Sequence, residues 1–163
     1  MDLPKEVEKY LLSFENDGFS LVGFYQQGSS VFGLADEFSD IDFIIIWKSE
    51  YPKDVIREKT AKKFGYETHD FKDIPQVEKG LDAFIYKGKV VNIAHIKDTD
   101  FFNFYNDLQN FDDYYEEMFM RLEGFVKSVI LNDPSGRLKE YKSKIKITPE
   151  IVNKFTLFIK DEL

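Results

Sequence analysis

The pattern of hydrophobic and polar residues predicts strands in the first two thirds of the chain and helices in the last third. Its strongest feature is Ile41–Trp47, a run of β-branched and aromatic residues that is typical of a β-strand. Because this run is apolar nearly throughout, we expect a central strand that is covered on both faces. Residues 19–25 form a second apolar run between turn residues, and residues 66–71 are a further strand candidate.

Two helices and a hairpin complete the expectation for the first hundred residues. Residues 4–14 repeat apolar side chains at helical spacing, which predicts an amphipathic helix. A second helix is expected to begin at Pro52 and to end near Gly65, because proline is favoured at the start of a helix and glycine just past its end. The remaining runs are the strands of a predicted β-hairpin, at residues 81–86 and 89–96 around a turn at Lys87-Gly88.

After residue 100 the period becomes helical. Thr148 and Pro149 are expected to open the last helix, as its N-cap and in its first turn. We therefore expect an α/β or α+β fold: a mixed β-sheet flanked by helices, with a core of residues 1–100 and a helical section of residues 101–163 packed on it. The other features expected in this section are a helix over 101–131 with a break near 110–112, a turn at 132–136 and a short helix at 137–144.

Composition and charge narrow the function. The 163 residues suffice for one domain with a buried core. A count of 22 Lys and Arg against 30 Asp and Glu gives a formal charge of −8, and so acidic a surface disfavours a nucleic-acid polymer as partner. No apolar run approaches the roughly 20 residues that cross a bilayer, no signal peptide is expected, and cysteine is absent, which excludes thiolate metal sites. We expect a soluble, cytoplasmic protein that binds no membrane.

One stretch carries candidate chemistry. Gly28 and Ser29 follow a predicted strand, where glycine lets the backbone approach a ligand closely and free N–H groups favour an anion such as phosphate. Asp40 and Asp42 stand at the entry of the strongest strand and, two residues apart, point to the same side at a spacing of about 6–7 Å. Such a pair repels itself unless a cation such as Mg²⁺ lies between the carboxylates. The alternatives are an ordinary strand-to-helix turn at Gly28-Ser29 and a solvated strand edge at the aspartates.

The order Gly-Ser, short helix, Asp-x-Asp and hydrophobic strand resembles the signature of the DNA polymerase β-like nucleotidyltransferase superfamily. Residues 129–138 are in addition similar to a stretch of small bacterial nucleotidyltransferases of the aminoglycoside and lincosamide type. The resemblance implies a nucleotidyltransferase-type sheet and transfer of a nucleoside monophosphate from an NTP, with ATP the expected one, to a hydroxyl of a small molecule or protein. It implies nucleotide contacts by Gly28, Ser29 and Ser39, and catalysis and Mg²⁺ binding by Asp40 and Asp42.

The sequence departs from that signature at the third carboxylate. The aligned residue is Asn92, whose amide carries no charge and takes no proton near neutral pH. In the predicted hairpin Asp82 pairs with Ile93 and projects to the opposite face, and His95 also faces away from Asn92. Four other acidic residues could reach back to the site: Glu67, Asp70, Asp98 and Asp100.

Other chemistry-bearing residues have simpler interpretations. Arg121, on a helix expected over 118–130, could reach a triphosphate. His69 and His95 lack partner spacing and are interpreted as structural or surface residues. The acidic run 112–117 and the lysines of 139–146 are interpreted as solvated faces.

Two function classes follow. The first is a Mg²⁺-dependent nucleotidyltransferase with catalytic positions Asp40, Asp42 and Asn92. The alternative is a catalytically degenerate protein of the same fold that binds nucleotide or a protein partner, in an antitoxin-like or regulatory role. In either class, a protein partner or a homodimer is an expected possibility. Template-directed polymerisation is not expected, because the acidic chain offers no track for a template.

Overall fold

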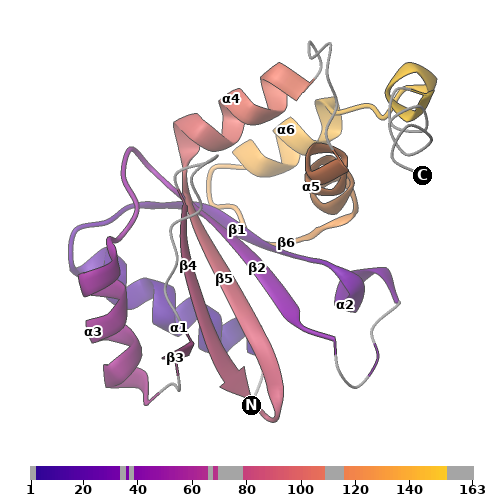
Figure 1. The fold of residues 1–163 in the computed structure, drawn as a ribbon. Helices are drawn as coiled ribbons and strands as arrows, with labels where there is room; N and C mark the ends of the chain where they lie inside the picture. The colour runs from indigo at the N-terminus through magenta and orange to yellow at the C-terminus, as the bar shows by residue number, and fades with distance from the viewer. Residues whose placement is uncertain are drawn as a thin grey trace.

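The computed structural model describes residues 3–33, 36, 39–65, 68–69, 79–108 and 116–153. Within these residues, six strands form one mixed sheet in the order β3-β4-β5-β2-β1-β6 (Figure 1). The strands are β1 (Leu21–Gln27), β2 (Ile41–Trp47), β3 (Thr68–His69), β4 (Lys79–Tyr86), β5 (Lys89–Lys97) and β6 (Val129–Asn132). The helices are α1 (Leu3–Asn16), α2 (Ser29–Phe32), α3 (Asp54–Phe64), α4 (Asp98–Leu108), α5 (Glu116–Lys127) and α6 (Arg137–Lys144), and a further helical segment covers 149–153.

The fold is the expected mixed α/β arrangement, with helices on both faces of the sheet. Helices α1 and α3 lie on one face, whereas α4, α5 and α6 lie on the other (Figure 1). Strand β2 pairs in parallel with β5, and every other strand pair is antiparallel. The prediction that Ile41–Trp47 is a central strand covered on both faces is thereby confirmed.

Two separate hydrophobic clusters fill the space between the sheet and the helices. On the α1 side the apolar face of α1 packs against odd-numbered residues of β2 and β5, such as Phe43, Ile45 and Ile93. On the other side, even-numbered Ile46 packs with the aromatic residues of α4 and with Phe125 of α5. The alternation follows from strand geometry, because successive side chains point to opposite faces. Within the described part of the chain, no helix is long and apolar enough to cross a membrane.

Several boundaries match the sequence expectation. Gly65 ends α3 in the left-handed conformation (φ 66°), although α3 begins at Asp54, two residues after Pro52. The predicted hairpin has the expected register, with Tyr86 opposite Lys89. The expected helix at 137–144 is α6, and the Thr148 hydroxyl accepts a hydrogen bond from the Ile151 N–H at 3.3 Å, as expected of an N-cap.

The helix expected over 101–131 is wrong at its end. Helix α5 stops at Lys127, the Ser128 hydroxyl donates to the carbonyl of Phe125 at 2.7 Å, and Val129–Asn132 forms β6. Strand β6 pairs antiparallel with β1 at the edge of the sheet, and these long-range hydrogen bonds decide the conformation of a short apolar run that periodicity alone leaves ambiguous. The expected break near 110–112 lies outside the described residues, as does most of the expected strand at 66–71, of which Thr68–His69 is observed.

Candidate functional site

The parallel pairing of β2 and β5 brings the predicted site residues together. Asp42 lies level with Asn92 across the two strands. The Asn92 side-chain amide donates to Asp42 Oδ1 at 3.1 Å and to Asp40 Oδ2 at 3.3 Å. One amide NH₂ group therefore bridges both carboxylates and offsets part of their mutual repulsion.

Gly28 lies directly against this carboxylate pair. Strand β1 runs antiparallel to β2 with Gln27 opposite Asp42, so that Gly28 follows immediately at the end of β1. Gly28 has φ 88° and ψ −171°, a conformation open essentially to glycine alone. A Cβ at this position would lie 2.6 Å from Asp42 Oδ2. Both the backbone conformation and the space therefore require glycine at position 28.

The serines around the carboxylates differ in their surroundings. Ser29 begins α2, and no hydrogen bond of its hydroxyl is found within the described part of the chain. The Ser30 hydroxyl, in contrast, accepts a hydrogen bond from Gln26 Nε2 at 3.1 Å. Ser39 donates to Asp36 Oδ1 at 2.6 Å and accepts from the Asp36 N–H at 3.0 Å, so these two bonds join Ser39 to Asp36 immediately before Asp40.

The electrostatics of Asp42 reflect its partial burial and its two neighbours Asn92 and Asp40. Burial raises the pKa of the Asp42 carboxyl, the nearby Asp40 carboxylate raises it further, and the hydrogen bond from Asn92 opposes part of the rise. A bound cation would favour the ionised form and reverse that shift.

The donor set fits a hard divalent cation. Asp40 and Asp42 offer carboxylate oxygens, and Asn92 can present its amide oxygen once the side chain turns about its last torsion. The described residues contain no group of three His, Cys, Asp or Glu side chains that could hold a metal ion. The candidate site is not such a group, because its third residue is the uncharged Asn92. The residues that would hold Mg²⁺ are therefore two carboxylates assisted by one amide.

Among the described residues, Asp98 and Asp82 are not brought to this point. Asp98 follows β5 at its far end, where it accepts hydrogen bonds from the Ser49 N–H at 3.2 Å and from Arg137 at 3.3 Å. Asp82 lies opposite Ile93 and is buried on the α1 side of the sheet, as expected. Glu67 and Asp70 are outside the described residues.

A pocket lies beside the carboxylates on the same face of the sheet. It encloses about 480 Å³ of empty space, part of which is open to solvent. Ile44 and Ala94 belong to its lining and stand two residues beyond Asp42 and Asn92, which places them about 7 Å along the strands. The full lining is Tyr25, Gln27, Ile44, Ala94, Ile96, Asp100, Phe101, Phe104, Tyr105 and Arg121.

The sequence did not predict this pocket. Two of its lining residues had been named for other reasons, Arg121 as a possible triphosphate contact and Asp100 as a possible third acid. Burial raises the pKa of Tyr25 and of Tyr105 well above the ordinary value, so both stay neutral phenols. The Tyr105 hydroxyl donates to the Arg121 carbonyl at 3.1 Å, which ties α4 to α5. The one sign of the pocket in the sequence is Gln27, a polar residue at the end of an apolar strand next to Gly28.

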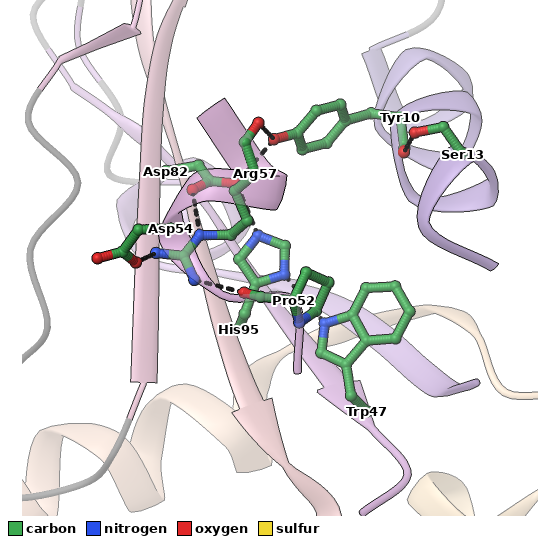
Figure 2. A network of polar contacts seen from close by, with 8 residues as sticks. All are labelled: Tyr10, Ser13, Trp47, Pro52, Asp54, Arg57, Asp82 and His95. Carbon is green, nitrogen blue, oxygen red and sulfur yellow. Dashed lines mark hydrogen bonds and ion pairs between the residues drawn. The ribbon is translucent and has the colours of Figure 1, made fainter. Parts of the chain in front are cut away.

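A second polar cluster lies on the opposite face, around Asp82 (Figure 2). Arg57 Nε donates to Asp82 Oδ1 at 2.7 Å, and the Tyr10 hydroxyl donates to Asp82 Oδ2 at 2.8 Å. Trp47 Nε1 donates to His95 Nδ1 at 2.9 Å. Because an indole N–H only donates, Nδ1 carries no proton, and Nε2–H of a neutral His95 donates to Asp82 Oδ2 at 2.8 Å.

The cluster is sealed from solvent and is structural. Arg57 and His95 are fully buried, and Asp82 is 2% exposed. Burial by itself raises the pKa of Asp82, but the His95 side chain, the Arg57 guanidinium and the Tyr10 hydroxyl together hold that pKa below its usual value. The predictions that His95 faces away from Asn92 and is structural are confirmed. The side chain of His69 lies outside the described part.

No model of a known protein family matches this chain, and a search of curated proteins finds no match.

Proposed function

We propose that the protein is a Mg²⁺-dependent nucleotidyltransferase that moves a nucleoside monophosphate from an NTP to a hydroxyl group. The observation that carries the proposal is the contact of Gly28 with Asp42, at a point where Asp40 and Asn92 also converge. A glycine that leaves no room for a side chain, followed by the Ser29 hydroxyl, suits the close approach of a triphosphate. Asp40 and Asp42 suit the cation that accompanies it.

The residues have distinct tasks in this reaction. Gly28 and Ser29 would hold the triphosphate, and Asp40 and Asp42 would hold Mg²⁺, which supplies charge neutralisation and orients the reacting oxygens. The acceptor oxygen forms a bond to the α-phosphorus while the bond to the pyrophosphate oxygen breaks. The hydroxyl proton passes to solvent, because the Asn92 amide is no base near neutral pH.

Calorimetric titration with ATP and with GTP, each with and without Mg²⁺, tests the nucleotide site before any acceptor is known. We expect Mg²⁺-dependent binding that the double variant Asp40→Asn/Asp42→Asn abolishes. Glu15→Gln/Asp17→Asn removes the same number of charges at the exposed C-terminal end of α1 and should bind like the unchanged protein. Absence of Mg²⁺-dependent binding of either nucleotide would overturn the proposal.

Asn92 supports a second candidate function. An amide in place of a carboxylate suits a protein that binds nucleotide or a protein partner without turnover, in an antitoxin-like or regulatory role. Turnover in the unchanged protein that Asp42→Asn removes would exclude this candidate. Activity that appears only in Asn92→Asp would favour it, and a co-purifying protein that the chain modifies would instead favour the enzyme acting on a protein acceptor.

A further inference from the structure

The pocket beside the carboxylates is lined by residues that the proposed reaction does not use. We propose that it binds the nucleobase of the NTP whose phosphates would lie at Gly28 and Ser29. This inference rests on the proposed function and adds to it the part of the substrate that the pocket recognises.

The first argument is position. Asp42 and Asn92 mark one end of a shared strand face, and Ile44 and Ala94 continue that face into the pocket. The step of about 7 Å between them is of the size that a ribose spans between a phosphate and a base. Gln27, opposite Asp42 on β1, lines the pocket as well, so pocket and carboxylates share a border.

The second argument is the chemistry of the walls. Four aromatic residues line the pocket, and the small Ala94 leaves space against the sheet. Aromatic side chains offer faces on which a flat base can stack. The aromatic lining residues are Tyr25, Phe101, Phe104 and Tyr105.

The third argument is the polar part of the lining. The Asp100 carboxylate only accepts hydrogen bonds, and the Arg121 guanidinium only donates them. A nucleobase serves both, because its edge carries ring or carbonyl acceptors beside N–H donors. Arg121 also lies over the Phe104 ring, 5.4 Å from its centroid, which places the guanidinium beside the aromatic wall.

The test compares nucleotides with a probe that has the phosphates but no base. Binding of ATP, GTP and inorganic tripolyphosphate, all with Mg²⁺, is measured by calorimetry for the unchanged protein, Ala94→Leu and Asp100→Asn. Ala94→Leu fills the pocket and should weaken ATP and GTP binding by at least about tenfold while leaving tripolyphosphate unchanged. Asp100→Asn replaces the carboxylate of the lining, and it should weaken binding of the preferred nucleotide by about tenfold and again spare tripolyphosphate.

Ala94→Ser is the matched control, because it changes the same position without filling the space. Thermal unfolding of each variant verifies the fold. If Ala94→Leu and Asp100→Asn each bind ATP and GTP as tightly as the unchanged protein does, the inference is overturned while the proposed function stays intact. Failure of tripolyphosphate and both nucleotides to bind the unchanged protein would instead overturn the proposed function, and the inference with it.

Discussion

At the scale of single residues, Gly28 is constrained by its own backbone and by its neighbour Asp42. Its φ of 88° is unfavourable for any residue with a side chain. In addition, a Cβ at this position would clash with Asp42 Oδ2. Chain conformation and carboxylate position are therefore coupled at one residue. A change at Gly28 moves the end of β1, the start of α2, or the Asp42 side chain.

Gly28→Ala is expected to destabilise the fold by about 1–3 kcal/mol and to abolish Mg²⁺-dependent nucleotide binding, because the new methyl group displaces Asp42. Urea unfolding measures the first effect and calorimetry the second. Gly136→Ala is the control: Gly136 also has a positive φ, 72°, but nothing lies within 4 Å of the Cβ that would be added. This variant should lose about 1 kcal/mol and keep nucleotide binding. Equal loss of binding in both would show that the Asp42 contact is irrelevant.

At the scale of elements, the cluster around Asp82 joins two helices to the sheet. Tyr10 comes from α1, Arg57 from α3, and His95 and Trp47 from β5 and β2. The cluster lies on the back of the two strands that carry Asp42 and Asn92. It therefore stabilises the pairing that holds the candidate site together, without touching that site.

Asp82→Asn should destabilise the protein by about 3–5 kcal/mol at pH 7, because it leaves the fully buried Arg57 without its carboxylate. Asp54→Asn removes the other carboxylate that pairs with Arg57, but Asp54 is 51% exposed, and the expected loss is below about 1 kcal/mol. Urea unfolding of both variants measures the difference. Equal losses would show that burial does not set the strength of these pairs.

The same carboxylate makes stability depend on pH. The folded-state pKa of Asp82 lies below its ordinary value of about 3.9, so its contribution is present above that value and is lost as the pH falls through the folded-state pKa. The stability difference between the unchanged protein and Asp82→Asn should stay constant from pH 7 to about pH 5 and shrink below about pH 4. A difference that grows on acidification would contradict this assignment.

Helices and strands can be predicted from the sequence when the interactions that form them join residues close together in the chain. Strand β2, helix α6 and the hairpin register follow from local pattern and turn residues, and each is observed as expected. Strand β6 does not, because it depends on pairing with β1, about a hundred residues earlier.

The candidate site divides in the same way. Its local part, from Gly28 to Asp42, is visible as a motif, and the convergence with Asn92 was expected from alignment to a signature. The pocket needs side chains from three strands and two helices, and no sequence pattern joins them. The partners of Asp82 are equally distant in sequence, so a lone acid in an apolar strand was the only sign of the cluster.

At the scale of the whole molecule, the two faces of the sheet are covered by different parts of the chain. Residues 3–64 supply α1 and α3, whereas residues 98–144 supply α4, α5, α6 and also the edge strand β6 (Figure 1). Both parts bury aromatic side chains against the same strands. The sheet is therefore shared by the two sections of the chain.

A chain shortened to residues 1–100 should not fold cooperatively. It loses Phe101, Phe125 and Leu138 from the core against β1 and β2, and it loses β6. These three side chains alone contribute about 5–9 kcal/mol, which is comparable with the whole stability of a domain. Circular dichroism during heating should show no sharp transition, whereas a chain ending at residue 153 keeps these contacts and should show one. A cooperative transition of the short chain would show that the first section folds alone.

The parallel pairing of β2 with β5 also sets an order of assembly. Strands β1 and β2 are near neighbours in the chain, so Gly28 and Asp42 meet through a short loop. Asn92 reaches them only after the segment between Trp47 and Lys89 has closed, at a larger entropic cost. During refolding the two carboxylates therefore stand together before the amide that bridges them arrives. We expect a divalent ion to compete with Asn92 at that stage, so that the divalent-ion content of the solution would affect the folding rate.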